Sequence, residues 1–235
     1  MSDALGLYDR EYECPNCGEK FTTKRVKISR VANIRKDTDF CPYYRWENPL
    51  FYEVRVCPFC SYAFTDSFGG LNKPQREKLK HLDKVEIENL DYCGERDLAI
   101  ATASYAHALK VASLIGEKHL IMAGLSMRLA WMYRYADNEV SDRRFLMQGL
   151  YHYELAYQDE PIERMGMDFD TMHYLLGELN GRIGRYQESR RWFSKIISNH
   201  EAKKALHDLA EDQWQKYNDE MKAAAKSDKS EEDAN

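Results

Sequence analysis

Apolar residues recur every three or four positions along most of the chain after about residue 70. This spacing is typical of helices that bury one face against a core. It predicts seven helices, over residues 74–91, 97–115, 118–135, 141–158, 170–183, 187–198 and 201–225. The last stretch, 226–235, has no large apolar residue and is expected to be a disordered tail.

Residues that start and stop helices agree with these segments. Three polar residues are expected to be N-caps: Asp97, Ser141 and Asp170. Three residues are expected to end helices, namely Gly116, Pro161 and Gly184.

The first 70 residues follow a different pattern. They contain five of the six cysteines, four of the six prolines and many β-branched or aromatic residues. We expect a small β-containing domain over 1–70, with β-structure at 26–33 and a strand over 50–56. Residues 68–74 form a short junction in which Asn72 can cap the next helix and Pro74 suits its first turn.

Composition narrows the class of protein. The net charge is -5, so the whole molecule is not built to bind nucleic acid or anionic lipid. No apolar run approaches the ~20 residues that span a bilayer, and residues 1–10 do not have the apolar core of a secretory signal. We therefore expect a cytoplasmic protein, in which disulfides are rare and clustered cysteines indicate metal.

Four cysteines form two copies of one motif. Cys14 and Cys17, and likewise Cys57 and Cys60, are two residues apart, with proline after the first cysteine of each pair. Such a turn directs two sulfurs to one point, and two turns give a tetrahedral four-sulfur cage. The sequence predicts a structural Zn²⁺ site, because a closed cage leaves no coordination position for a substrate. Iron in a rubredoxin-like cage would use the same ligands.

The two remaining cysteines leave one alternative open. Cys41 could replace one of the four ligands or remain a buried thiol. Cys93 follows the first predicted helix and is expected to be a small buried residue.

The predicted helices resemble a tetratricopeptide repeat. Residues 183–189 and Phe193 resemble the turn and second helix of such a repeat, and Leu176 and Gly177 fall where its first helix has a large-small pair. A partial copy lies at 129–161, and a plain helical bundle is the alternative. In a repeat of this kind the first helices line a groove, whose partner-binding residues here would be Met127, Trp131, Arg134, Tyr135, Tyr174, Glu178 and Arg182.

A basic segment supports a different function. Residues 20–36 contain seven basic residues and no acid, and ten aromatic residues lie between Phe40 and Phe68. Basic strands beside aromatic residues can bind single-stranded nucleic acid. The alternative interpretation is an aromatic core beneath a solvated basic face.

Residues 37–41, 47–52 and 54–63 together resemble an uncharacterised bacterial family, domain of unknown function 2225. The resemblance runs from about Tyr8 to Ile197. It implies a bacterial cytoplasmic protein with a cysteine-knuckle domain followed by tetratricopeptide-like helices, and it implies no activity. Ser61 departs from the glycine that the family tends to have there.

Signatures of common enzymes are missing from the sequence. It contains no phosphate-binding loop, no nucleophile elbow and no His-Glu-x-x-His motif. His107 and His173 fall at helix positions that pack. The sequence thus predicts a mostly α protein, with a zinc-ribbon-like domain at 1–70 and a tetratricopeptide-like domain at 71–225. We expect a zinc-binding adaptor for a protein or peptide partner and not an enzyme. A nucleic-acid-binding protein and a thiol-based redox or metal-responsive switch are the alternatives.

Overall fold

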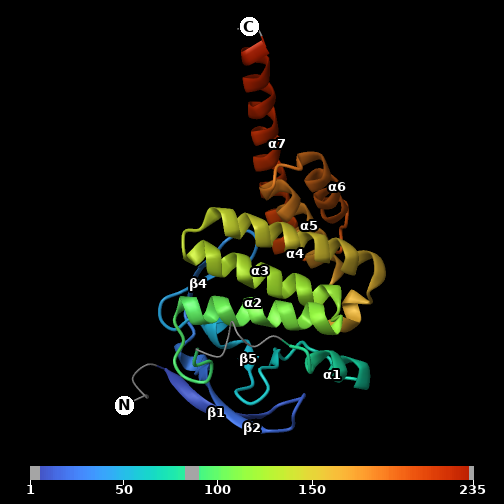
Figure 1. Cartoon of the computed structure of the whole chain (residues 1–235). Helices are drawn as coiled ribbons and strands as arrows, with labels where there is room; N and C mark the ends of the chain where they lie inside the picture. The colour runs from blue at the N-terminus through green and yellow to red at the C-terminus, as the bar shows by residue number, and fades with distance from the viewer. Residues whose placement is uncertain (1–5, 83–89, 233–235) are drawn as a thin grey trace. The chain divides into compact units, whose positions relative to one another are not determined.

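The computed structural model describes residues 6–82 and 90–232, with side chains up to residue 223 (Figure 1). The chain divides into two compact units, Met1–His152 and Tyr153–Asn235, which are described separately.

The first unit begins with three short antiparallel strand pairs. Strand β1 (Leu7–Glu13) pairs with β2 (Lys20–Val26), β3 (Asn33–Lys36) with β4 (Pro42–Tyr44), and β5 (Arg55–Val56) with β6 (Ala63–Phe64). Short 3-10 turns lie at Ile28–Arg30 and Pro49–Tyr52. The turn of the β1–β2 pair carries the first two cysteines of the repeated motif, and that of the β5–β6 pair carries the other two.

Helices complete the first unit. They are α1 (Lys73–Leu79), α2 (Leu98–Ile115), α3 (His119–Tyr135) and the first part of α4 (Glu139–Asp159). The Asp97 side chain caps α2, and Gly116 ends it in the left-handed conformation, as predicted. By length and hydropathy α2 could cross a membrane, but half of it is buried inside the protein, where it packs on α3 and β6. It is the core helix of this unit.

The second unit contains the end of α4, a 3-10 turn (Ile162–Met165), α5 (Phe169–Arg182), α6 (Tyr186–Ile197) and α7 (Lys204–Glu232). Helices α5 and α6 approach closely where Gly177 faces Phe193, since a Cβ atom on Gly177 would lie 2.7 Å from the Phe193 ring. Gly184 lies in the turn between them with φ 86°. The mostly α fold with a small strand-containing N-terminal region is thus confirmed.

Several predicted boundaries are wrong. Helix α1 ends at Leu79, whereas the sequence predicted a helix over 74–91, of which 83–89 lie outside the described residues. The N-cap of α5 is Asp168, not Asp170, and the Asn138 side chain accepts from the Ser141 backbone N–H where Ser141 was expected to be the cap. Helix α7 continues to Glu232, past residue 225 where a disordered tail was expected.

The predicted β-structure is also placed incorrectly. Residues 28–30 form a 3-10 turn within the stretch expected to be β-structure. Residues 49–52 form another, because Pro49 fixes its first position and the Asn48 side chain accepts the Leu50 N–H. Only Arg55 and Val56 of the expected strand 50–56 pair as a strand.

Side chains from beyond residue 70 are embedded among the strands of the first unit. Arg96 is buried, and its guanidinium donates to the carbonyls of Val54 (2.7 Å) and Phe51 (3.1 Å). The Tyr105 hydroxyl on α2 donates to the Leu50 carbonyl at 2.8 Å. The first compact unit therefore extends beyond residue 70, where the composition changes, and includes α2 and α3. That residues 1–70 and 71–225 fold separately stays a prediction.

Candidate metal centre

Both cysteine pairs occupy the same kind of turn. The Gly18 N–H donates to the Cys14 carbonyl at 2.9 Å, and the Ser61 N–H donates to the Cys57 carbonyl at 2.8 Å. Gly18 (φ 78°) and Ser61 (φ 64°) both have the left-handed backbone conformation that lets the chain reverse there. The repeated sequence motif thus produces a repeated turn.

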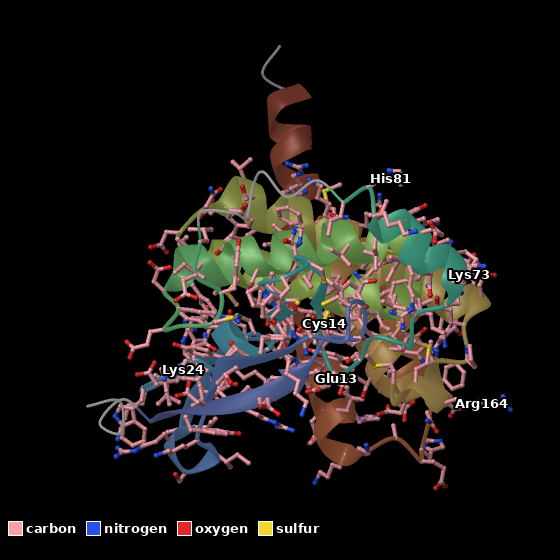
Figure 2. The ribbon with its side chains drawn as sticks, turned by 60° about the horizontal axis from the view of Figure 1, so that its bottom comes forward. Glu13, Cys14, Lys24, Lys73, His81 and Arg164 are labelled. Atoms are coloured by element: carbon pink, nitrogen blue, oxygen red, sulfur yellow. The ribbon has the colours of Figure 1, made fainter. Side chains whose placement is uncertain are left out.

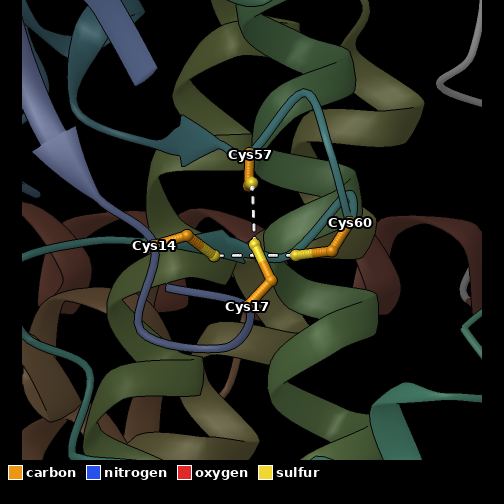
Figure 3. Close-up of side chains that lie close together, drawn as sticks. All are labelled: Cys14, Cys17, Cys57 and Cys60. Carbon is orange, nitrogen blue, oxygen red and sulfur yellow. Dashed lines mark hydrogen bonds between the residues drawn. The ribbon is translucent and has the colours of Figure 1, made fainter. Parts of the chain in front are cut away.

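These turns bring four sulfurs together (Figure 3). The Sγ atoms of Cys14 and Cys60 are 3.6 Å apart, those of Cys17 and Cys57 are 3.7 Å apart, and all four lie within 4.8 Å of one another. A tetrahedral ion with metal–sulfur bonds of ~2.3 Å separates its sulfurs by about 3.8 Å. The four side chains therefore fit one tetrahedral ion without a change of fold.

The surroundings of the sulfurs shift the thiol pKa values in both directions. Backbone N–H groups of Asn16 and Cys17 lie against the Cys14 sulfur, and those of Phe59 and Cys60 against the Cys57 sulfur, and each lowers the thiol pKa. Burial acts in the opposite sense and raises the pKa of Cys57 to about 11. A hydrogen bond from Cys14 lowers the pKa of Cys60 to about 4, and the same bond raises the pKa of Cys14. A metal ion would displace the remaining protons.

Helices hold both turns from outside. The Arg76 guanidinium on α1 donates to the carbonyls of Pro15 (2.6 Å) and Asn16 (2.7 Å) in the first turn. The Nε2 of His107 on α2 lies 2.7 Å from the Ser61 carbonyl in the second turn, and since a carbonyl only accepts, Nε2 donates.

Figure 2 shows Cys14 at one end of the β1–β2 hairpin and Lys24 toward the other. Sequence reasoning missed Arg76, and it placed His107 only as a packing residue.

Cys41 does not belong to the cluster. Its side chain is fully buried, and its Sγ lies 3.6 Å from the Tyr135 hydroxyl on α3. Burial raises the pKa of Cys41 to about 11. The structure therefore favours the buried-thiol alternative. Cys93 is half-buried, and burial raises its pKa as well.

A second group of potential ligands lies on one turn of α7. His207, Asp208 and Glu211 share an accessible face, and Nε2 of His207 lies 3.1 Å from the Ile197 carbonyl. None of the three is buried, so this group lacks the enclosed geometry of the cysteine cluster.

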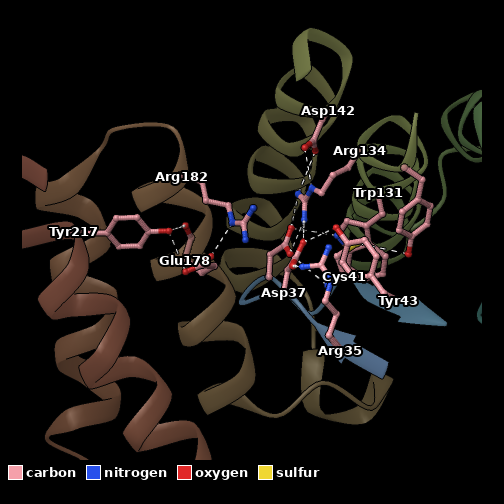
Figure 4. A network of polar contacts seen from close by, with 12 residues as sticks. Arg35, Asp37, Cys41, Tyr43, Trp131, Arg134, Asp142, Glu178, Arg182 and Tyr217 are labelled. Atoms are coloured by element: carbon pink, nitrogen blue, oxygen red, sulfur yellow. Dashed lines mark hydrogen bonds and ion pairs between the residues drawn. The ribbon is translucent and has the colours of Figure 1, made fainter. Parts of the chain in front are cut away.

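The prediction of an open groove on α3 is wrong. Met127 and Trp131 are buried, and the Trp131 indole N–H donates to Asp39. The Arg134 guanidinium contacts Asp37 and Asp142, as Figure 4 shows, and it also contacts Asp39. The Tyr135 hydroxyl donates to the Pro42 carbonyl. Trp131, Arg134 and Tyr135 thus join α3 to the β3–β4 segment, and Met127 lies against Gly149 of α4.

The groove residues expected on α5 are also buried or hydrogen-bonded within the second unit. Tyr174 and Glu178 are fully buried. The Glu178 carboxylate accepts from Arg182 Nε at 2.7 Å and from the Tyr217 hydroxyl at 3.1 Å (Figure 4). Tyr174 and Glu178 therefore join α5 to α6 and α7, and Arg182 is paired with Glu178 on α5 itself.

Part of the basic segment is neutralised by its neighbouring strand. Lys24 lies 2.9 Å from Asp9, and Lys20 lies 3.6 Å from Glu11. Arg25 donates to the Tyr52 carbonyl at 3.2 Å. All three cations of strand β2 therefore have a polar partner, although the Lys20 side chain is still 67% exposed.

The fold and the cluster define a protein with a candidate four-cysteine metal centre packed against helices. The chain belongs to a bacterial family described as an uncharacterized protein conserved in bacteria, domain of unknown function 2225, which matches residues 7–217. This confirms the resemblance drawn from the sequence. No curated protein and no solved structure matches the chain.

Proposed function

We propose that the chain is a bacterial cytoplasmic adaptor whose first unit is stabilised by one Zn²⁺ and binds a protein partner. The observation that carries the proposal is the approach of four cysteine sulfurs to within 4.8 Å of one another. Four thiolates complete a tetrahedral shell, which supports a structural role and leaves no open coordination position for catalysis.

Zinc is favoured over iron by the chemistry of a structural site. Zn²⁺ has no redox chemistry and takes a tetrahedral four-thiolate shell without electronic preference. Binding at such a site contributes directly to folding, and values of ~10 kcal/mol or more are typical of small zinc domains. Three short strand pairs supply little core of their own, so a metal in this position would hold their turns in place.

The helical packing supports a tetratricopeptide-like arrangement for α5 and α6. Gly177 allows the Phe193 ring to approach the helix backbone, and Gly184 turns the chain between the two helices. This is the large-small seam expected of such a repeat. Since the predicted groove residues are buried or paired, the proposal does not place the partner on them.

The redox alternative has less support than the adaptor. A reactive thiol needs thiolate character and access to solvent. Burial raises the pKa of both Cys41 and Cys93, and a metal ion would hold the thiolates of the four clustered cysteines. The nucleic-acid alternative has a weaker electrostatic basis than the sequence indicated, because Lys20 and Lys24 are ion-paired with strand β1.

Elemental analysis with cross-linking in the native bacterium tests the proposal. The purified chain should contain about one zinc, and Cys57→Ser should lose both the zinc and the cross-linked protein. Cys93→Ser is the matched control, because Cys93 lies outside the cluster, and it should retain both. Iron in place of zinc would overturn the metal assignment. Cross-links that disappear on nuclease treatment would support the nucleic-acid alternative and overturn the adaptor.

A further inference from the structure

Large apolar side chains are exposed on one part of the first unit. Ile28 is 90% exposed, Ile34 59%, Trp46 54% and Val31 37%. They belong to the 3-10 turn after β2, to β3 and to the segment that follows β4. Leaving four large apolar side chains in water without a partner is unfavourable, and exposed apolar patches commonly mark interaction sites.

Backbone hydrogen bonds bring together the segments that carry these residues. The Val31 N–H donates to the Ile28 carbonyl at 3.0 Å. The Arg45 N–H donates to the Ala32 carbonyl at 3.0 Å. This bond joins the segment before β3 to the end of β4, and Trp46 is the next residue after Arg45. We call Ile28, Val31, Ile34 and Trp46, with the cations among them, the β3–β4 patch.

The cations of the β3–β4 patch are exposed. They are Arg30, Lys36 and Arg45. No acidic residue occurs in 20–36. The nearest acid after this segment, Asp37, is held by Arg134 and Arg35, each at 3.1 Å. The patch therefore combines exposed apolar side chains with exposed cations.

Strand β3 also offers backbone groups. It pairs with β4 along one edge, and no strand in the described part of the chain pairs with its other edge. All four of its residues are exposed. An open strand edge presents N–H and C=O groups to an extended segment, which adds as a further strand.

We infer that the β3–β4 patch binds an extended acidic segment of a protein partner. The segment pairs with the free edge of β3, its apolar side chains cover Ile34 and Trp46, and its carboxylates face Lys36 and Arg45. This inference rests on the proposed adaptor function and names the surface on which that function depends.

Two features favour a peptide over other anionic partners. Nucleic acid is bound through aromatic stacking, but three of the four apolar side chains of the patch are aliphatic. A lipid surface would not satisfy the backbone groups of an open strand edge, whereas a peptide strand would. Apolar cover, negative charge and strand pairing come together only in an acidic peptide.

Binding of short blocked peptides to the full chain tests the inference. The peptides alternate valine or tyrosine with glutamate, and two control sets replace glutamate by lysine or scramble the alternation. Ile34→Ser with Trp46→Ser should weaken binding by about tenfold or more, as loss of central anchors does. Lys36→Glu with Arg45→Glu should also weaken it and should lower its dependence on salt.

Matched control variants come from outside the patch. Val140→Ser removes another exposed aliphatic side chain (83% exposed), and Lys118→Glu reverses another exposed cation. Both should bind the alternating peptides as the unmodified chain does. Equal binding of the scrambled or lysine peptides would overturn the inference, as would no binding of the alternating peptides.

Preferential binding of anionic phospholipid vesicles or oligothymidine through the patch would also overturn it, and so would self-association through β3. The adaptor proposal is tested separately by the native cross-link. If that cross-link survives both double variants of the patch, the adaptor function stands and this surface is wrong. If no protein cross-links at all, the adaptor function itself fails.

Discussion

The Arg134 guanidinium on α3 lies 2.8 Å from the carboxylate of Asp39, whose side chain is completely buried. A second bond joins the same two groups at 3.0 Å, so the contact is bidentate. Asp39 also accepts the indole N–H of Trp131. This pair fastens the loop between β3 and β4 to α3.

Replacing Arg134 by alanine should therefore destabilise the first unit. The change leaves a buried carboxylate without its counter-charge, which typically costs about 3 kcal/mol or more. Urea unfolding followed by tryptophan fluorescence measures the loss. Arg191→Ala, at a position with a 73% exposed side chain, is the control and should change stability by less than about 1 kcal/mol. Equal stability of both variants would contradict the structural role of Arg134.

Replacing His107 by leucine should loosen the second cysteine turn. The change leaves the Ser61 carbonyl buried without its donor, at a cost of about 1–3 kcal/mol. Zinc should consequently pass more readily to a competing chromophoric chelator, while the four ligands stay intact. His200→Leu, an exposed histidine of the second unit, is the control. Unchanged zinc transfer in His107→Leu would show that α2 does not support the site.

Replacing Ser61 by glycine should stabilise the chain by about 1 kcal/mol, because a left-handed conformation is strained in any residue with a Cβ atom. The reverse change, Gly18→Ser in the first turn, should destabilise by a similar amount. A Cβ atom on Gly18 meets nothing within 4 Å, so that cost is conformational and not steric. Thermal unfolding of both variants measures the effect. Destabilisation by Ser61→Gly would refute the equivalence of the two turns.

Acid should destabilise the second unit through His173. Burial, together with the charge of Lys195, holds the pKa of His173 below its ordinary value, and Asp170 opposes this shift. The unfolded chain therefore binds the proton more readily, so the stabilisation is complete above about pH 6.5 and declines as pH falls below that value. His173→Phe should flatten this dependence, since Phe169, Tyr157 and Trp192 already surround the ring. An unchanged pH profile in that variant would exclude His173 as the cause.

Local signals in the sequence predicted most of the helices and the clustering of the four cysteines. Asp97 and Gly116 act within a few residues of themselves, so α2 could be bounded from sequence. The two cysteine turns are equally local, and their repetition indicated a shared site. The long-range contacts could not be found in this way. Arg134 meets Asp39 across 95 positions of the chain, and nothing near either residue distinguishes a buried ion pair from a free arginine on a groove.

The short elements were predicted incorrectly because their conformation also depends on particular contacts. Residues 49–52 contain aromatic and aliphatic residues that favour strands, but Pro49 and the Asn48 cap impose a 3-10 turn. Asp168 and Asp170 are both suitable caps by composition, and only the backbone geometry shows that Asp168 accepts the Thr171 N–H. Residue propensity identifies which residue types can cap a helix or form a strand. Which of two neighbouring candidates does so depends on the hydrogen bonds that each makes in the folded chain.

X-ray absorption at the zinc edge of the purified chain is the most direct test of the four-cysteine centre. The account predicts about one zinc per chain with a single shell of four sulfurs at ~2.3 Å. Cys57→Ser should lose the zinc, and Cys93→Ser should give the spectrum of the unmodified chain. A shell that contains nitrogen or oxygen in the unmodified chain, or full four-sulfur coordination in Cys57→Ser, would contradict the account.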